Sequence, residues 1–169
     1  MKGLLKFAVV AALMIAGVSQ VSAQQAKLGY IKFDELVTSM PEYKAAGEEF
    51  EKKVQEIETQ RTKMQEEWTA AVKEYEEKAG TYTQIVRQAK EQEIMQMQQR
   101  IQNFVELAQQ ELQSVNEQLM APIYEKAKTT VDDVAKSNGF TYVFDAGALI
   151  YTAPEAIDLM PMVKAKLGI

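Results

Sequence analysis

The stretch between Glu48 and Ala121 contains a single glycine, Gly80, in the segment EEKAGTYTQ, and no proline. Glycine and proline are the residues that most destabilise the interior of a helix, and this stretch is otherwise rich in good helix formers. A run of this length with one break near its middle predicts two long helices of similar length. The alternative is one uninterrupted helix through Gly80, since a glycine costs only about 1 kcal/mol inside a helix.

The apolar residues on each side of Gly80 recur in steps of three and four, interrupted only at Arg61, which places them on one face of a helix. The first series is Phe50, Val54, Ile57, Met64, Trp68, Ala71 and Tyr75, and the second is Ile94, Met97, Ile101, Phe104, Ala108, Leu112, Val115 and Leu119. Two helices with one narrow stripe each bury those stripes most readily against each other, as in a coiled coil. We therefore expect residues 42–121 to form a long antiparallel helical hairpin, an arm of about 54 Å.

The tip of this hairpin is expected at residues 78–82, in the segment Lys78-Ala79-Gly80. There Gly80 would adopt a positive φ angle, end the first helix and start the chain reversal. Folding the chain about Gly80 places Pro41 and Pro122 at similar distances from the tip. The two prolines are therefore predicted to mark the base of the arm, where it enters a body.

Outside the arm, short strand-forming runs replace the helical stripes. They lie at residues 28–31, 142–144 and 149–151, and the last two runs, joined at Asp145-Ala146-Gly147, are expected to form a β-hairpin or two paired strands. A helical stretch from Ile123 should stop at Asn138-Gly139, and a short closing helix is expected over residues 156–167. Because three short strands bury little alone, residues 26–41 and 122–169 are predicted to form one small α+β body.

The first 23 residues have the pattern of a secretory signal peptide. Lys2 and Lys6 precede or flank an uncharged apolar run over residues 7–18, and Val21-Ser22-Ala23 is typical of a signal-peptidase site. The competing interpretation is a membrane anchor, but twelve apolar residues are too few to span about 30 Å of hydrocarbon. No other segment of the sequence is long and apolar enough to cross a membrane. We expect export, with residues 24–169 as the mature chain.

Composition excludes several classes of function. Without the two lysines of the signal peptide, 17 Lys and Arg stand against 24 Asp and Glu, a net charge of −7 that argues against nucleic-acid binding. The sequence has no phosphate-binding loop, no Cys and no His, so neither ATP hydrolysis nor nucleophilic catalysis is indicated. Asp132-Asp133 is not a metal site, because adjacent carboxylates point in different directions on a helix. We expect no enzyme activity and no cofactor.

The segments LGYIKFDELVTSMPEYKAA and YVFDAGALIYTAPEAIDLMPMV, with the long hairpin between them, resemble the Skp/OmpH-like family of periplasmic chaperones. The resemblance covers nearly all of the mature chain. It is most specific at Val143, Asp145, Ala146, Tyr151, Asp158 and Leu159. The hairpin is less specific, because the sequence of any helical hairpin has a similar pattern. The acidic arm is a departure, because familiar members have basic arms.

This resemblance implies an ATP-independent chaperone of the periplasm of a Gram-negative-type cell. It would be a homotrimer with three arms around a cavity that holds unfolded outer-membrane proteins and prevents their aggregation. Oligomerisation would proceed through the body, at Leu28, Tyr30, Val143, Asp145, Ile150 and Tyr151. The alternative is a structural envelope protein or adaptor whose hairpin serves as a spacer or docking arm.

Candidate client-binding residues lie midway along the arm. Reflecting positions about Gly80 brings Met64 near Met95 and Met97, and methionine suits surfaces that adapt to many sequences. The same reflection sets Trp68 opposite residue 92, where no large apolar partner is available, so its ring either packs on nearby polar stems or stays available to a client. The alternative for these residues is that they fill the seam between the helices.

Basic residues near the tip decide whether the arm is expected to contact an anionic membrane surface. Lys73, Lys78, Arg87 and Lys90 stand there among many glutamates. They leave a weak contact with a membrane or with lipopolysaccharide as an open alternative.

Overall fold

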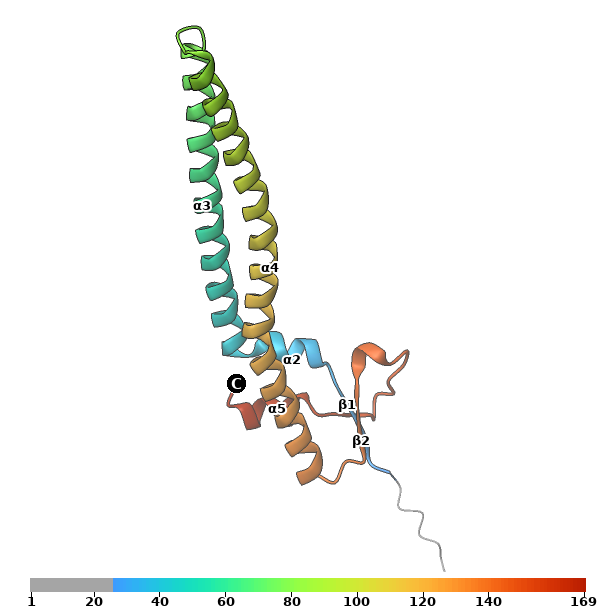
Figure 1. The fold of residues 1–169 in the computed structure, drawn as a ribbon. Helices are drawn as coiled ribbons and strands as arrows, with labels where there is room; N and C mark the ends of the chain where they lie inside the picture. Colours follow the sequence, from blue (N-terminus) through green and yellow to red (C-terminus); the bar gives the residue numbers. More distant parts are fainter. Residues whose placement is uncertain (1–25) are drawn as a thin grey trace, which may run out of the picture.

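The computed structural model describes residues 26–169. The predicted signal peptide, residues 1–23, lies outside the described residues. The element order is β1 (Leu28–Ile31), α2 (Phe33–Ser39), α3 (Pro41–Lys78), α4 (Gln84–Ser137), β2 (Tyr142–Asp145), a 3₁₀ turn (Ala146–Ala148), β3 (Ile157–Asp158) and α5 (Met160–Leu167). Figure 1 shows the two long helices projecting from a small strand-containing body, as the sequence predicted.

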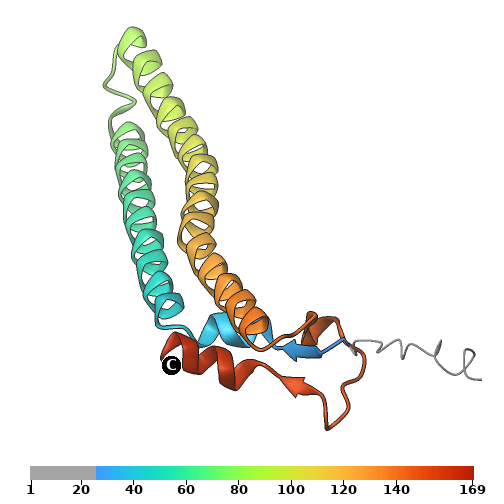
Figure 2. The same ribbon diagram turned by 90° about the horizontal axis from the view of Figure 1, so that it is seen from below.

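Helices α3 and α4 lie side by side along the whole arm, which we define as α3 together with residues 84–121 of α4 (Figures 1 and 2). Three polar side-chain pairs in the described residues join the two helices: Lys53 with Glu111 at 2.5 Å, Tyr75 with Glu91, and Lys126 with Glu42. In each pair the two residue numbers add to between 164 and 168. The helices therefore run in opposite directions, and positions reflect about residues 82–84 rather than about Gly80.

Hydrogen bonds of two threonines, and not a glycine with positive φ, form the turn at the tip. The backbone N–H and the hydroxyl of Thr81 both donate to the Lys78 carbonyl, at 2.8 and 2.7 Å, and so satisfy the end of α3. Thr83 then caps α4 by accepting a hydrogen bond from the Val86 N–H. Among the described residues only Gly139 and Gly168 have positive φ. The predicted positive φ at Gly80 is wrong, because side-chain caps already end one helix and begin the next.

Pro122 does not end a helix. Helix α4 runs through it for 54 residues, from the tip into the body. Pro122 has no N–H to donate to the preceding turn, and such a position favours a bend; in Figure 2, α4 curves as it enters the body. Pro41, by contrast, is the first residue of α3, where its missing N–H costs nothing. The two prolines do lie near the base of the arm, but only Pro41 lies at a helix boundary.

The body contains a three-stranded parallel sheet in the order β2-β1-β3. Leu28 pairs with Tyr142, and Gly29 pairs with Val143 on one side and Ile157 on the other. The predicted pairing of residues 142–144 with 149–151 is wrong, since 149–151 lie outside the strands. The reason is local: Asp145 accepts a hydrogen bond from the Gly147 N–H at 3.0 Å and starts a 3₁₀ turn instead of a tight hairpin.

Helix α5 begins at Met160 rather than near residue 156, because residues 157–158 pair with β1. The Asp158 carboxylate accepts a hydrogen bond from the Met160 N–H at 2.8 Å and helps to start the helix. Helix α4 stops at Asn138-Gly139 as predicted. Gly139 has φ +70°, and the Phe140 N–H donates to the Ala135 carbonyl, which is the hydrogen bond of a Schellman motif.

One hydrophobic core holds the body together and includes the lower part of α4. Leu36, Leu159 and Val163 have no exposed surface, and they pack with residues on the buried face of α4. Those α4 residues are Ile123, Ala127, Val131 and Val134. The same helix therefore supplies one side of the arm and one wall of the body core, which ties the orientation of the arm to the body.

Candidate functional site

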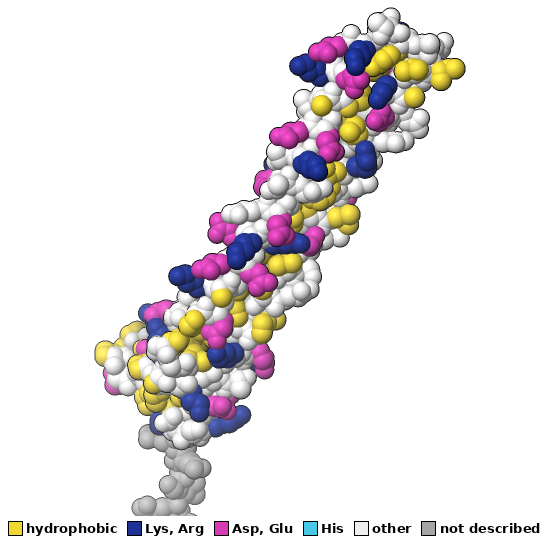
Figure 3. Space-filling model, turned by 90° about the vertical axis from the view of Figure 1, so that its left-hand side faces the viewer, with side chains coloured by type: hydrophobic (Ala, Val, Ile, Leu, Met, Phe, Trp, Pro, Cys, Tyr) yellow, Lys and Arg dark blue, Asp and Glu magenta, His cyan; other side chains and the backbone are white. Residues whose placement is uncertain are grey.

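The seam, meaning the apolar side chains that α3 and α4 turn toward each other, is only half-buried. Within the arm, Ala108 in α4 and Ala46 at the base of α3 are buried, while the larger seam residues stay partly exposed. Two helices alone cannot enclose a stripe of large side chains on all sides. The arm therefore carries a line of accessible apolar surface along its length, visible in Figure 3 as a yellow line.

Two of the four predicted client-binding residues come together in the seam. Met64 and Met97 line a small hollow of about 200 Å³ together with Ile101, Gln60, Glu67 and Arg100. Met95 does not line this hollow and is 62% exposed. The predicted cluster thus consists of Met64 and Met97, whereas Met95 stands apart.

Trp68 is half-buried, and the observed register changes its surroundings. Reflection about residues 82–84 puts it level with Met97, not with residue 92, so a large apolar side chain does lie at its height across the seam. The error arose because the five residues between α3 and α4 were counted as if the chain reversed at Gly80. The Trp68 indole N–H is buried without a hydrogen-bond partner in the described part of the chain.

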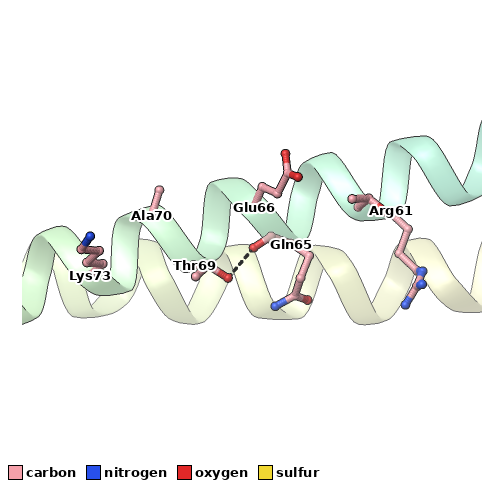
Figure 4. Close-up of a pocket in the computed structure, with 7 residues that line it drawn as sticks. Arg61, Gln65, Glu66, Thr69, Ala70 and Lys73 are labelled. Atoms are coloured by element: carbon pink, nitrogen blue, oxygen red, sulfur yellow. Dashed lines mark hydrogen bonds between the residues drawn. The ribbon is translucent and has the colours of Figure 1, made fainter.

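A second hollow, of about 400 Å³, lies on α3 alone (Figure 4). Its lining combines charged residues with small ones: Arg61, Thr62, Gln65, Glu66, Thr69, Ala70 and Lys73. The Thr69 hydroxyl donates to the Gln65 carbonyl of the preceding turn at 2.8 Å, so it is occupied within the helix. This surface is open and contains no pair of side chains arranged as a nucleophile and a base.

Ion pairs along the arm are exposed. Hydrogen bonding to Lys126 lowers the pKa of Glu42 at the base, and hydrogen bonding to Glu111 raises the pKa of Lys53 higher up. Near the tip, the Tyr75 hydroxyl donates to Glu91, which raises the pKa of that phenol. Exposed pairs of this kind contribute little stability each. They set the register of the two helices more than they hold them together.

Large apolar side chains gather on the exposed surface of the sheet and of the segment after it. Of the residues predicted for oligomerisation, Ile150 is fully exposed and Tyr151 is 77% exposed, while Leu28 is about half exposed. Tyr30 and Val143 are half-buried, and Asp145 is exposed but engaged with Gly147. The structure places these residues in one small body.

Sequence reasoning missed two members of this surface. Tyr142 and Phe144 are exposed, and their rings stack with their centres 6.2 Å apart. Strand alternation could have found both, because Val143 turns inward and its neighbours must turn outward. We call Leu28, Tyr142, Phe144, Ile150 and Tyr151 the body surface.

Two kinds of site are not found among residues 26–169. No group of three or more acidic, cysteine or histidine side chains in this range is arranged to hold a metal ion. In the same range no helix is both long and apolar enough to cross a membrane.

Comparison with known proteins identifies the family. The model of the family "Outer membrane protein (OmpH-like)" matches residues 27–167, which is nearly the whole described chain. This protein belongs to the OmpH-like family. That family of chaperones is non-enzymatic, in agreement with the sequence. No match was found among curated proteins.

A solved structure shares the fold. It is a crystal structure from Caulobacter crescentus CB15, described as a candidate outer membrane chaperone (OmpH-like). The two superpose with a TM-score of 0.76 and 17% sequence identity, over 84% of this chain and 83% of that one. At this identity the similarity establishes the fold, and family membership supports a general chaperone role.

Proposed function

We propose that this protein is an ATP-independent holdase of the periplasm, which binds unfolded outer-membrane proteins and prevents their aggregation before membrane insertion. The observation that supports this most directly is the half-buried seam of the arm. It offers apolar and methionine surface to an unfolded chain, and the sequence contains no phosphate-binding loop. Family membership supports the chaperone role in general.

The working form is proposed to be a homotrimer assembled through the body surface. Five large apolar side chains are exposed there, and the sheet has only three short strands, with β2 and β3 at its edges. Exposed edges and grouped apolar residues are typical of surfaces that a partner covers. Three copies joined through their bodies would project their arms around a common cavity.

Clients are proposed to contact the middle of the arm at Met64, Trp68, Met95 and Met97. Met95 is the most exposed of the four, and Met64 and Met97 line the same hollow. Flexible, polarisable methionine side chains adapt to many sequences, as a holdase with varied clients requires. Because the arm is acidic, capture should depend on apolar contacts and change little with salt concentration.

The test measures two properties of the mature protein. Light scattering gives its mass, and turbidity reports whether it prevents aggregation of several unrelated outer-membrane β-barrel proteins diluted from denaturant. We expect a trimer that protects all of these clients. A monomer at micromolar concentration would remove the cage, and protection of one partner or none would favour a spacer or adaptor.

An Ile150→Ser, Tyr151→Ser variant probes the body surface specifically. Both side chains are exposed in the single chain, so the substitutions should leave its helices intact while weakening the assembly. Loss of the oligomer with unchanged helicity is the expected result. An unchanged mass would show that the subunits associate elsewhere.

A further inference from the structure

The two helices of the arm differ in the kind of polar residue that they contain. Residues 94–121 of α4 contain ten Gln or Asn and four charged residues. The 28 residues of α3 that face them in the observed register, 44–71, contain three Gln and twelve charged residues. In Figure 3 the seam separates a flank with many charged side chains from a flank that is largely uncharged along the lower arm.

Five of the α4 amides follow one line along the helix, which we call the amide stripe: Gln98, Gln102, Gln109, Gln113 and Asn116. Their steps of three, four and seven keep them together, about a quarter-turn round α4 from the seam. All five are exposed. Met95, which is exposed, continues the same line at the end nearer the tip, and Met120 at the other end packs against the body core.

Much of the hydrogen-bonding capacity of the stripe is unused. Gln113 donates to Glu117 at 3.0 Å, but Gln98, Gln102 and Gln109 have no side-chain hydrogen bond within the described part of the chain. A primary amide carries donors and an acceptor, which are the same groups that every peptide unit offers. It is also neutral at every physiological pH, so it neither selects nor repels clients by charge.

We propose that the amide stripe of α4 binds the peptide backbone of an unfolded client chain. The backbone is the one chemical feature that all unfolded clients share, and the exposed Met95 would add an apolar contact at one end of the stripe. Several weak hydrogen bonds along one helix give sequence-tolerant binding through multivalency. The inference rests on the proposed holdase function and assigns client contact to α4 rather than to the charged α3.

The test variant is Gln98→Ala, Gln102→Ala, Gln109→Ala. Alanine is the best helix former and these side chains are exposed, so α4 should stay helical and the oligomer unchanged. The control replaces the two exposed amides of α3 that do not line the Met64–Met97 hollow, in Gln55→Ala, Gln65→Ala. Circular dichroism and light scattering check that both variants keep the wild-type helicity and mass.

Two labelled peptides serve as probes. One has the alternating apolar and polar residues of an outer-membrane strand, and the other has the same sequence with every second backbone nitrogen methylated, which removes donors without changing side chains. Wild-type protein and the α3 control should bind the unmethylated peptide about tenfold more tightly, a difference of ~1.4 kcal/mol that a few modest hydrogen bonds can supply. The α4 variant should lose most of that preference. Any effect of methylation on the peptide's own conformation is the same for all three proteins and cancels in the comparison.

The outcomes separate this inference from the proposed function. If wild-type protein binds neither the peptides nor unfolded β-barrel proteins, the holdase function itself is wrong. If it binds them but the α4 variant keeps the full preference for the unmethylated peptide, the backbone-binding role of the stripe is wrong. A changed oligomeric mass in the α4 variant would assign the stripe to contacts between copies of this chain and would also overturn the inference.

Discussion

Gly29 and Gly47 lack a side chain in very different surroundings. A Cβ atom on Gly29 would lie 2.3 Å from Leu159 Cδ1 and 2.8 Å from Phe140 Cε1, so the central strand lies too close to the core for any larger residue. Gly47 lies inside α3 with nothing within 4 Å of the same position, and its φ is not positive. Packing therefore requires the first glycine and not the second.

Substitution by alanine should have opposite effects at these two glycines. Gly29→Ala should lower the free energy of unfolding by about 1–3 kcal/mol, because the overpacked core must shift. Gly47→Ala should raise it by about 0.5–1 kcal/mol, because alanine is the better helix former. Urea denaturation of the two variants measures both changes. A destabilised Gly47→Ala protein would mean that another chain approaches α3 closely at this point.

Besides its proposed contact with clients, Trp68 is expected to contribute to packing within the arm. Trp68→Gln should destabilise the protein by about 1–3 kcal/mol, less than for a fully buried ring because the residue is half-buried. Trp68→Phe is the control: it keeps an aromatic ring and removes an N–H that has no partner, so its cost should be smaller. Thermal melts and client binding are compared for both variants. Unchanged stability with weakened capture in Trp68→Gln would show that the ring serves client contact alone, and lowered stability with unchanged capture would show that it only packs.

At the scale of the elements, α4 is the unusual member of the fold. Its upper part follows the seam with a narrow apolar stripe, and its lower part supplies Ile123, Ala127 and Val131 to the body core. Pro122 stands at the transition, where it removes one backbone hydrogen bond from the helix. The helix stays continuous because the body core and the contact with α3 hold it on both sides of the proline.

Pro122→Ala should restore the missing hydrogen bond to the Gln118 carbonyl. An interior proline costs about 3 kcal/mol relative to alanine, and the greater freedom of the unfolded chain offsets about 1 kcal/mol of this, so stability should rise by about 2 kcal/mol. Thermal unfolding measures the gain, and hydrogen exchange of residues 118–126 should slow. A loss of stability would show that the body core requires the bend of α4.

At the scale of the whole molecule, the arm is expected to bind clients and the body is expected to hold the oligomer together. Arm contacts are local to α3 and α4, while the sheet and the proposed oligomer surface lie in the body. The length of the arm can then vary without loss of assembly. Any such change must respect the observed register, because removing unequal or offset segments would place charged residues in the seam.

Deleting residues 58–71 together with residues 94–107 shortens both helices by the same two heptads and keeps the natural tip. The deletion removes all four candidate client residues, Met64, Trp68, Met95 and Met97. We expect an oligomer of the same subunit number that no longer prevents aggregation of unfolded outer-membrane proteins. Light scattering and turbidity measure the two properties separately. Full protection by the short protein would show that the arms do not hold clients, and dissociation would place the interface in the arms.

The sequence by itself determined the elements whose signals are local. The two apolar stripes around one glycine predict long helices, and Asn138-Gly139 predicts the end of α4 because a left-handed glycine satisfies the last carbonyls of a helix. The signature around Asp145 and Asp158 pointed to the family that the match over residues 27–167 then confirmed. Each of these inferences depends on residues close together in the chain.

Only the tertiary structure decided how those elements meet. The register of the arm depends on the five residues of the turn and on cross-helix pairs such as Lys53–Glu111, and it moved Trp68 level with Met97. β2 and β3 do not pair with each other but pair in parallel with β1, which lies more than 100 residues away in the chain. Pro122 stays within a helix because packing on both sides outweighs the lost hydrogen bond. These outcomes depend on contacts between distant residues, whose energies no local pattern contains.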